Sequence, residues 1–294
     1  MNSRIKGFLQ LCRPANLPTA AADILAGLTL AGFFVNDQFL TLNKSWLLIL
    51  SSILLYAGGV VFNDVFDFEL DKIERAERPL PSGLVKYKEA VCFGLILIII
   101  GISTSFLVGV ICGYIALVLT LLILVYDSYS KKFSFLGPLN MGLCRGCNLL
   151  LGISIFGEFN NIEYVIIPII YIAAITMVSQ GEVHGKNKRN ILLAGGLYST
   201  VILLLVYFNT TKAIMTLTSY LFLVIFVLAI GIPLLRAYRH NIPVNIMKAV
   251  KAGVISIILL DAVIAVTFSN VIIGLLVLLL LPISMGLSKA FAVT

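Results

Sequence analysis

Long apolar segments recur along the whole chain, and they constrain the fold more than any other feature. Each is about as long as the roughly 20 residues that a helix needs to cross a bilayer. Charged residues make up 12% of the 294 residues, against about 25% in soluble domains. The segments lie near residues 17–35, 46–66, 90–109, 111–127, 137–157, 164–181, 191–208, 216–235, 248–268 and 271–290. We therefore expect an all-α, polytopic membrane protein.

Only Ser269-Asn270 separates the last two segments, so the chain is expected to have nine or ten transmembrane helices. No internal repeat is obvious, and no polar stretch is long enough to form a separate soluble domain. We therefore expect residues 1–294 to form a single transmembrane domain. The residues before Pro14 lack the compact apolar stretch of a cleaved signal peptide, so the first helix is expected to be retained.

Most of the Lys and Arg residues lie in alternate breaks between the apolar segments. They are Arg4, Lys6, Arg13, then Lys72, Arg75, Arg78, Lys86, Lys88, then Lys131, Lys132, then Lys186, Lys188, Arg189, then Arg236, Arg239, Lys248 and Lys251. The opposite breaks hold only Lys44 and Lys212. Because basic loops tend to stay in the cytoplasm, we expect a multi-pass protein of the bacterial inner (cell) membrane with a cytoplasmic N-terminus. The lipid bilayer is an expected partner, and nucleic acid is not.

The stretch NDVFDFELDKIERAERPLPSG, residues 63–83, gathers much of the charge at the cytoplasmic end of the second segment. Asn63, Asp67 and Asp71 are spaced i, i+4, i+8, which places them on one helical face. Two carboxylates and an amide oxygen suit Mg²⁺, which prefers oxygen ligands and is usually shared with substrate phosphates. Asp64 and Glu69 point elsewhere on the wheel, so we expect them to support the metal ligands from behind or to face solvent.

Lys72, Arg75 and Arg78 follow this face and form a basic rim suited to phosphate oxygens. A charged loop that only fixes the topology would explain these cations. It would not explain acidic and amide side chains on one face that runs back into the apolar segment, where carboxylates are costly and usually functional.

The pattern N-D-x-x-D-x-x-x-D followed by R-P-x-P-S-G resembles the first aspartate-rich motif of the UbiA superfamily of intramembrane prenyltransferases. Other features fit by order and spacing along nearly the whole chain. They are R-P-x-N at Arg13–Asn16, YDSYSKK at Tyr126–Lys132, GPLNMGLCRG at Gly137–Gly146, and a polar break after the sixth segment. The first motif is specific, and the others support it.

This resemblance implies a helical bundle around a central cavity. It also implies a magnesium-dependent enzyme that transfers a prenyl group from a polyprenyl diphosphate to a small acceptor. Carried over residue by residue, Mg²⁺ would bind Asn63, Asp67 and Asp71, with the two aspartates essential to catalysis. The substrate-binding residues would be Arg13, Asn16, Arg78, Lys131 and Arg145. Arg145 lies inside an apolar segment and needs an anionic partner, either a substrate phosphate or a neighbouring acid.

The expected second aspartate-rich motif is degraded here. The corresponding break reads SQGEVHGKNKRN, residues 179–190, with one carboxylate, Glu182. Glu182 could complete a metal site, and His184 could bind phosphate, act as a base or cap a helix. Lys186 or His184 could replace the positive charge of a second metal ion. The run G-E-V-H-G is most similar to the divergent UbiA-like EboC branch.

The degraded motif leaves a second function open. The chain could be a non-catalytic membrane protein that binds or moves an isoprenoid or its conjugate, having kept one metal site and lost the other.

Two further acids lie within apolar segments. We expect Asp23 either to face the cavity or to pair inside the bundle, and Asp261 to bond a hydroxyl or amide of another helix. Tyr126 and Tyr129 either face the substrate or belong to an interfacial belt.

Overall fold

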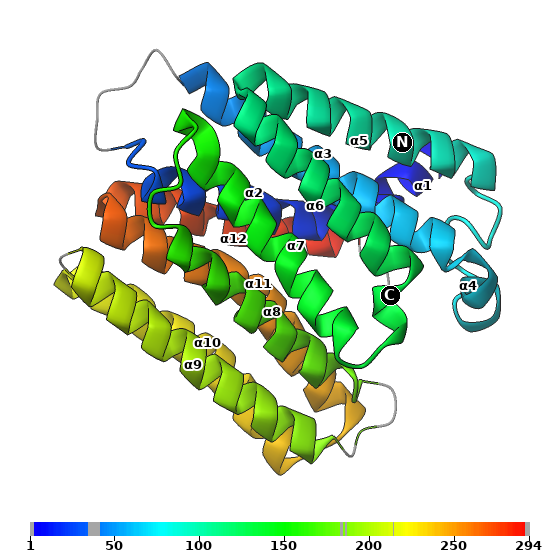
Figure 1. The fold of residues 1–294 in the computed structure, drawn as a ribbon. Helices are drawn as coiled ribbons and strands as arrows, with labels where there is room; N and C mark the ends of the chain where they lie inside the picture. The colour runs from blue at the N-terminus through cyan, green and yellow to red at the C-terminus, as the bar shows by residue number, and fades with distance from the viewer. Residues whose placement is uncertain (1–2, 35–41, 183–184, 186, 214, 292–294) are drawn as a thin grey trace.

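The computed structural model describes residues 3–34, 42–182, 185, 187–213 and 215–291, and these form a bundle of helices without β-strands (Figure 1). The α-helices are α1 (Ser3–Leu11), α2 (Leu17–Leu30), α3 (Leu42–Phe66), α4 (Phe68–Glu74), α5 (Tyr87–Val108), α6 (Val110–Ser128), α7 (Leu136–Ile153), α8 (Ile166–Ser179), α9 (Lys188–Lys212), α10 (Leu217–Arg239), α11 (Pro243–Phe268) and α12 (Val271–Ala290). Short 3-10 turns are η1 (Pro14–Asn16), η3 (Ser130–Lys132), η4 (Ser154–Phe156) and η5 (Ile162–Val165). The all-α prediction is confirmed.

Nine helices within the described ranges are long and apolar enough to cross a membrane. The first predicted segment instead forms the shorter helix α2, with 14 residues. The prediction of nine or ten spans therefore corresponds to nine long helices plus this short one. The break between the last two spans lies where the sequence places it, and the Asn270 side chain caps α12 by accepting a hydrogen bond from the Ile273 N–H at 3.1 Å.

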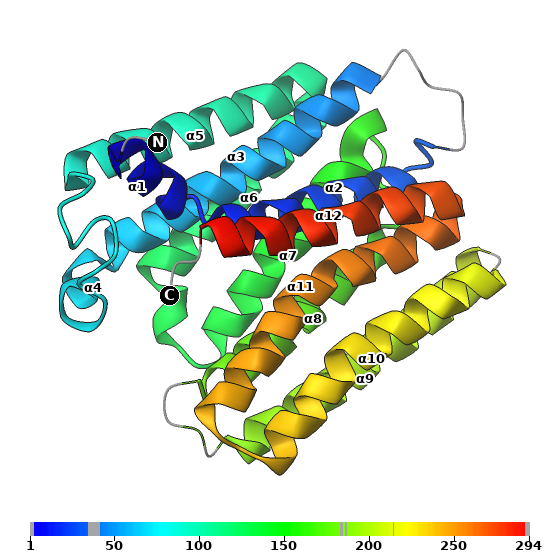
Figure 2. The same ribbon diagram turned by 180° about the vertical axis from the view of Figure 1, so that it is seen from behind.

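Helix α2 lies at the centre of the bundle, where it packs against α3, α7, α11 and α12. Figure 2 shows α5 and α3 on one side of it, and the α9–α10 pair along the opposite side of the molecule. This position explains why nearly all of α2 is buried. An ionisable side chain on α2 therefore needs a partner on a neighbouring helix.

Glycines allow α2 and α7 to touch through their backbones. A Cβ atom on Gly27 would lie 2.6 Å from the Leu149 carbonyl oxygen, and one on Gly152 would lie 2.7 Å from the Ile24 carbonyl oxygen. Small residues at such crossings are typical of membrane helix pairs, where close packing drives association. This contact fixes α2 against α7, and both helices line the cavity described below.

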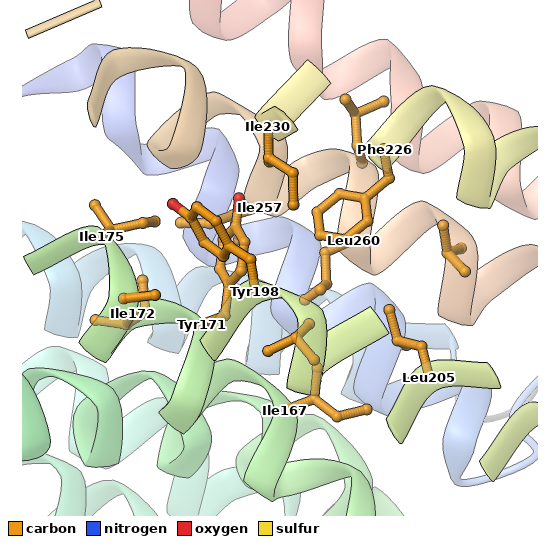
Figure 3. Packing of buried hydrophobic residues seen from close by; sticks show 14 of the residues in the cluster. Ile167, Tyr171, Ile172, Ile175, Tyr198, Leu205, Phe226, Ile230, Ile257 and Leu260 are labelled. Atoms are coloured by element: carbon orange, nitrogen blue, oxygen red, sulfur yellow. The ribbon is translucent and has the colours of Figure 1, made fainter. Parts of the chain in front are cut away.

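An aromatic core joins α8, α9, α10 and α11 (Figure 3). The ring of Tyr171 lies 5.2 Å from that of Tyr198 and 5.7 Å from that of Phe226. Tyr171 is fully buried, and its hydroxyl donates a 2.8 Å hydrogen bond to the Gly253 carbonyl. A buried tyrosine usually satisfies its hydroxyl in this way, so the core ties α8 firmly to α11.

The charged stretch folds into a break, a short helix and a turn at one end of the bundle. Helix α3 ends at Phe66, but backbone hydrogen bonds from Asp67 N to Asn63 O (3.0 Å) and from Asp71 N to Asp67 O (2.8 Å) preserve the helical spacing into α4. The turn after α4 passes through Gly83 with φ 75°, a conformation that favours glycine. It returns the chain to α5 and places Arg78 back over α3.

Candidate active site

A cavity of about 390 Å³ lies between α2, α3, α6, α7, α8 and α11. Most of its wall is apolar and includes Leu119, Ile123, Met141, Ile172, Ile175, Val254 and Ile257. Polar side chains line the rest. Four of the predicted site residues are among them: Arg13, Asn16, Asn63 and Arg145. The cavity is thus suited to a ligand with a polar head and an apolar body.

Arg13 joins the turn before η1 to the end of α3. Its Nη2 atom donates to Asp64 Oδ1 at 2.6 Å and lies 3.3 Å from Asn63 Oδ1. Asn63 in turn donates from Nδ2 to Asp127 Oδ1 at 2.8 Å, which connects α3 to α6. Arg13 has φ 46°, so its backbone is held in the left-handed region. Such a conformation persists only where surrounding contacts over-determine it, and these bonds supply such contacts.

Arg78 returns from the turn after α4 and bridges two acids. Its Nη1 atom lies 2.7 Å from Asp71 Oδ2 and 3.3 Å from Asp64 Oδ1. The three side chains are buried, with 11% of Arg78, 5% of Asp71 and 8% of Asp64 exposed. The guanidinium group therefore neutralises carboxylates that would otherwise be costly to bury.

Lys131 forms an ion pair with Asp67, which is another of the predicted metal ligands. Its Nζ atom is 2.6 Å from Asp67 Oδ1, and both side chains are mostly buried. Lys131 belongs to η3, directly after α6, so this pair links the break between α3 and α4 to the segment after α6.

Together these side chains form one charged cluster, which consists of Arg13, Asn63, Asp64, Asp67, Asp71, Arg78, Asp127 and Lys131. Each of its cations is paired with a carboxylate. Because carboxylates outnumber cations by one, the cluster gains no net positive charge from its basic residues. A diphosphate bound here would need additional positive charge.

The donor set fits a magnesium ion that is shared with a substrate. Among the described residues, no group of three or more His, Cys, Asp and Glu side chains is arranged to hold a metal alone. Asp67 and Asp71 each keep one carboxylate oxygen without a hydrogen-bond partner among the described residues. Mg²⁺ is commonly held by one or two carboxylates together with substrate phosphates, and these two oxygens suit that role.

Arg145 lies deeper in the cavity, on α7. Its Nε atom is 2.7 Å from Asp23 Oδ2, and an Nη2 hydrogen bond reaches the Thr19 carbonyl. Asn148 also donates to Asp23 Oδ2, at 2.8 Å. Of the two partners that the sequence allows for Arg145, the structure provides the neighbouring acid. The carboxyl group of Asp261 faces that of Asp23, and no hydroxyl or amide of the described residues bonds to it, unlike the interhelical bond that the sequence predicts.

The residues of the degraded motif are only partly described. Glu182 is half-buried after α8, and burial raises its carboxyl pKa while the positive charge of Arg75 opposes that shift. Its proposed metal-ligand role stays a prediction. His184 and Lys186 lie outside the described residues, as does any contact that they make.

Sequence reasoning missed one member of the charged cluster, Asp127. Of the two alternatives for Asp64, the structure shows the supporting one rather than the solvent-facing one, because Asp64 is buried and pairs with two arginines. Asp127 stands four residues before Lys131 in the motif YDSYSKK, and that helical spacing was the available signal. Tyr126 lines the cavity, whereas Tyr129 is exposed.

Comparison with known proteins places this arrangement among prenyltransferases. A model of the UbiA prenyltransferase family matches residues 24–243. Relatives include the digeranylgeranylglyceryl phosphate synthase of Methanosarcina mazei, 34% identical over 62% of this chain and 65% of the relative. That of Methanococcoides burtonii is 34% identical over 52% of this chain and 56% of the relative. The chain therefore spans less than two thirds of these relatives.

Solved structures share the fold. The structure of a digeranylgeranylglyceryl phosphate synthase has a TM-score of 0.67 at 24% identity, with 90% of this chain and 98% of that chain covered. A UbiA homologue from Archaeoglobus fulgidus bound to GPP and Mg²⁺ has a TM-score of 0.62 at 16% identity, with 98% and 100% covered. The cavity thus lies within a fold found in other UbiA proteins.

Proposed function

This chain belongs to the UbiA prenyltransferase family, and on that premise we propose that it transfers a prenyl group from a polyprenyl diphosphate to a small acceptor, with Mg²⁺. One observation carries the proposal: Asp67 and Asp71, next to Lys131 and Arg78, lie at one end of a bundle whose cavity wall is mainly apolar. The charged end suits a diphosphate, and the apolar wall suits a prenyl chain.

In the reaction, the bond between the allylic carbon and the diphosphate oxygen breaks, and its electron pair leaves with the diphosphate. A nucleophilic atom of the acceptor then bonds to that carbon and loses its proton. When bound through Asn63, Asp67 and Asp71, Mg²⁺ would supply positive charge to the leaving oxygens. Arg78 and Lys131 would add to that stabilisation by contacting the same oxygens. The apolar wall keeps water from the allylic carbon.

The acceptor class is suggested by the relatives. Their name describes a product in which geranylgeranyl groups are attached to glyceryl phosphate. A glyceryl phosphate that already carries one geranylgeranyl chain is therefore the first acceptor to test on this chain. The geometry of the charged cluster does not depend on that choice.

The test is magnesium-dependent release of pyrophosphate from geranylgeranyl diphosphate by the purified protein. Asp67→Ala and Asp71→Ala should each lower turnover by at least about a hundredfold, since each removes a metal-binding carboxylate. The matched control is Glu69→Ala, because Glu69 lies in the same stretch with its side chain 81% exposed. Full turnover in both aspartate variants would refute the assigned role of this face.

A second candidate function rests on the single carboxylate of the SQGEVHG segment. With only Glu182 available there, the chain would bind or move an isoprenoid conjugate without transferring it. Binding of a diphosphate lipid with no pyrophosphate release across a broad acceptor panel would favour that function. A single-turnover product that carries the prenyl chain would exclude it.

The remaining proposals concern placement. We propose a single domain over residues 1–294, with the charged end of the bundle in the cytoplasm of a bacterial cell. The distribution of Lys and Arg supports this orientation, and Figure 1 shows α4 and the ends of α6 and α8 at the same end of the molecule. The G-E-V-H-G run supports placement in the EboC-like branch.

A further inference from the structure

Arg145 has a hydrogen-bonding group that the protein does not use. Its side chain is only 9% exposed, its Nε atom faces Asp23, and its Nη2 atom donates to the Thr19 carbonyl. The Nη1 atom has no partner among the described residues, although Arg145 lines the cavity. Because Arg145 lines the cavity, Nη1 is free to donate to an acceptor atom of a ligand.

The polar side chains next to Arg145 already have hydrogen-bond partners within the protein. The Asn148 amide bonds Asp23, the Ala20 carbonyl and the Ser52 hydroxyl. The Thr19 hydroxyl donates to the Asn16 carbonyl at 2.7 Å. Nη1 of Arg145 is therefore a donor on this side of the cavity that has no protein partner among the described residues.

The charge around Arg145 determines which kind of oxygen fits. The carboxyl groups of Asp23 and Asp261 face one another, and Asp23 Oδ1 and Asp261 Oδ2 are buried without a hydrogen-bond partner among the described residues. A single proton shared between the two carboxyl groups satisfies both oxygens. The pair then carries one negative charge, which balances Arg145. A balanced cluster offers a hydrogen bond but no net attraction for an anion, and so it favours an uncharged oxygen.

The depth of Arg145 separates it from the diphosphate. Its partners Thr19 and Asp23 lie three and seven residues after Asn16 on α2, which is about 5 and 10 Å farther along the helix. The charged cluster lies at the Asn16 end, where Arg13 bonds Asp64. The prenyl chain has no oxygen to offer. The group that reaches Arg145 must therefore belong to the acceptor.

We propose that Arg145 Nη1 binds an uncharged, non-reacting oxygen of the acceptor, and that Asp23 and Asp261 are positioning residues that orient the guanidinium group and cancel its charge. This inference rests on the proposed prenyl transfer and adds a chemical class: an acceptor with an ether, hydroxyl or carbonyl oxygen next to its reacting atom, which would lie about one to two helical turns from the charged cluster. Arg145 would then select acceptors rather than diphosphates.

The test compares two acceptors in the full-length protein with Mg²⁺ and geranylgeranyl diphosphate. One is geranylgeranylglyceryl phosphate, and the other is its analogue with the ether oxygen replaced by a methylene group. The variant Arg145→Lys keeps a cation for Asp23 but cannot present Nε to Asp23 and a second donor to the cavity at once. Asn209→Ala removes a buried polar group outside the cavity and serves as the control for a loss of stability alone.

In the wild type, the analogue should have a KM at least about tenfold higher, the value of one hydrogen bond to a charged donor. Arg145→Lys should raise the KM of the ether acceptor by a similar factor and remove the difference between the two acceptors. The KM for geranylgeranyl diphosphate should not change. Asn209→Ala should lower the unfolding temperature and leave the ratio of the two acceptor KM values intact.

Two results would overturn the inference. One is an unchanged ratio between the two acceptors in Arg145→Lys, and the other is an equal rise in the KM for the diphosphate, which would make Arg145 a diphosphate ligand or a purely structural residue. Failure of the proposed function is distinguishable from both. It would appear as wild-type protein without magnesium-dependent pyrophosphate release, and it would remove this inference as well.

Discussion

Replacement of Lys131 by glutamine should change magnesium binding and turnover in opposite directions. Lys131 Nζ lies 2.6 Å from Asp67 Oδ1, with 16% and 24% of the two side chains exposed. A metal ion that binds Asp67 without a diphosphate must first compete with this lysine. A hydrogen bond between charged groups that are mostly shielded from water contributes about 1.5–3 kcal/mol. Lys131→Gln should therefore tighten magnesium binding by about tenfold to a hundredfold.

The assay is calorimetric titration of Mg²⁺ into purified protein without any diphosphate. The matched control is Lys132→Gln, because Lys132 is the exposed neighbour on the same turn and should leave the affinity unchanged. Pyrophosphate release by Lys131→Gln should fall, since the lysine no longer contacts the leaving diphosphate. Magnesium affinity that is unchanged or weaker in Lys131→Gln would refute the idea that Lys131 occupies the metal position on Asp67.

Two further substitutions test the cluster and the packing around it. Arg78→Met leaves Asp64 and Asp71 buried without the cation that they share. This variant should lower the free energy of unfolding by about 3–5 kcal/mol, measured by denaturation in detergent. A loss below about 1 kcal/mol would contradict the assigned pairing. Gly152→Ala places a methyl group against the α2 backbone and should cost about 1–3 kcal/mol. Gly196→Ala, where nothing lies within 4 Å of the new atom, should cost nothing and can stabilise α9 by up to about 1 kcal/mol, since Ala favours a helix over Gly. Equal losses in the two glycine variants would count against the close contact.

The sequence predicts the helices because the bilayer imposes a length on them. Apolar runs bounded by polar breaks are sufficient to locate nearly every span, including the two-residue break at Ser269-Asn270. The first span is the exception. Helix α2 ends at Leu30, earlier than its apolar run suggests. Hydropathy indicates which residues are apolar enough for a membrane, but it does not indicate where a helix inside the bundle ends.

The charged cluster is predicted in part, since helical spacing groups residues only within one helix. Asn63, Asp67 and Asp71 are found in this way. The pairing of Asn63 with Asp127 and that of Arg13 with Asp64 depend on how α6 and the η1 turn approach α3, which no spacing in one sequence records. For the same reason the sequence shows that Arg145 needs an anion but does not identify Asp23.

The paired charges at the end of the cavity imply selectivity against the cell's free ions. Inorganic phosphate alone must compete with the carboxylates that already pair with Arg78 and Lys131. A free cation must likewise compete with the basic side chains that already pair with Asp67 and Asp71. A complex of metal and diphosphate can replace both partners of each ion pair at once, because its metal binds the carboxylates and its phosphate oxygens bind the cations. The resting protein should therefore bind metal and diphosphate together far more tightly than it binds either one alone.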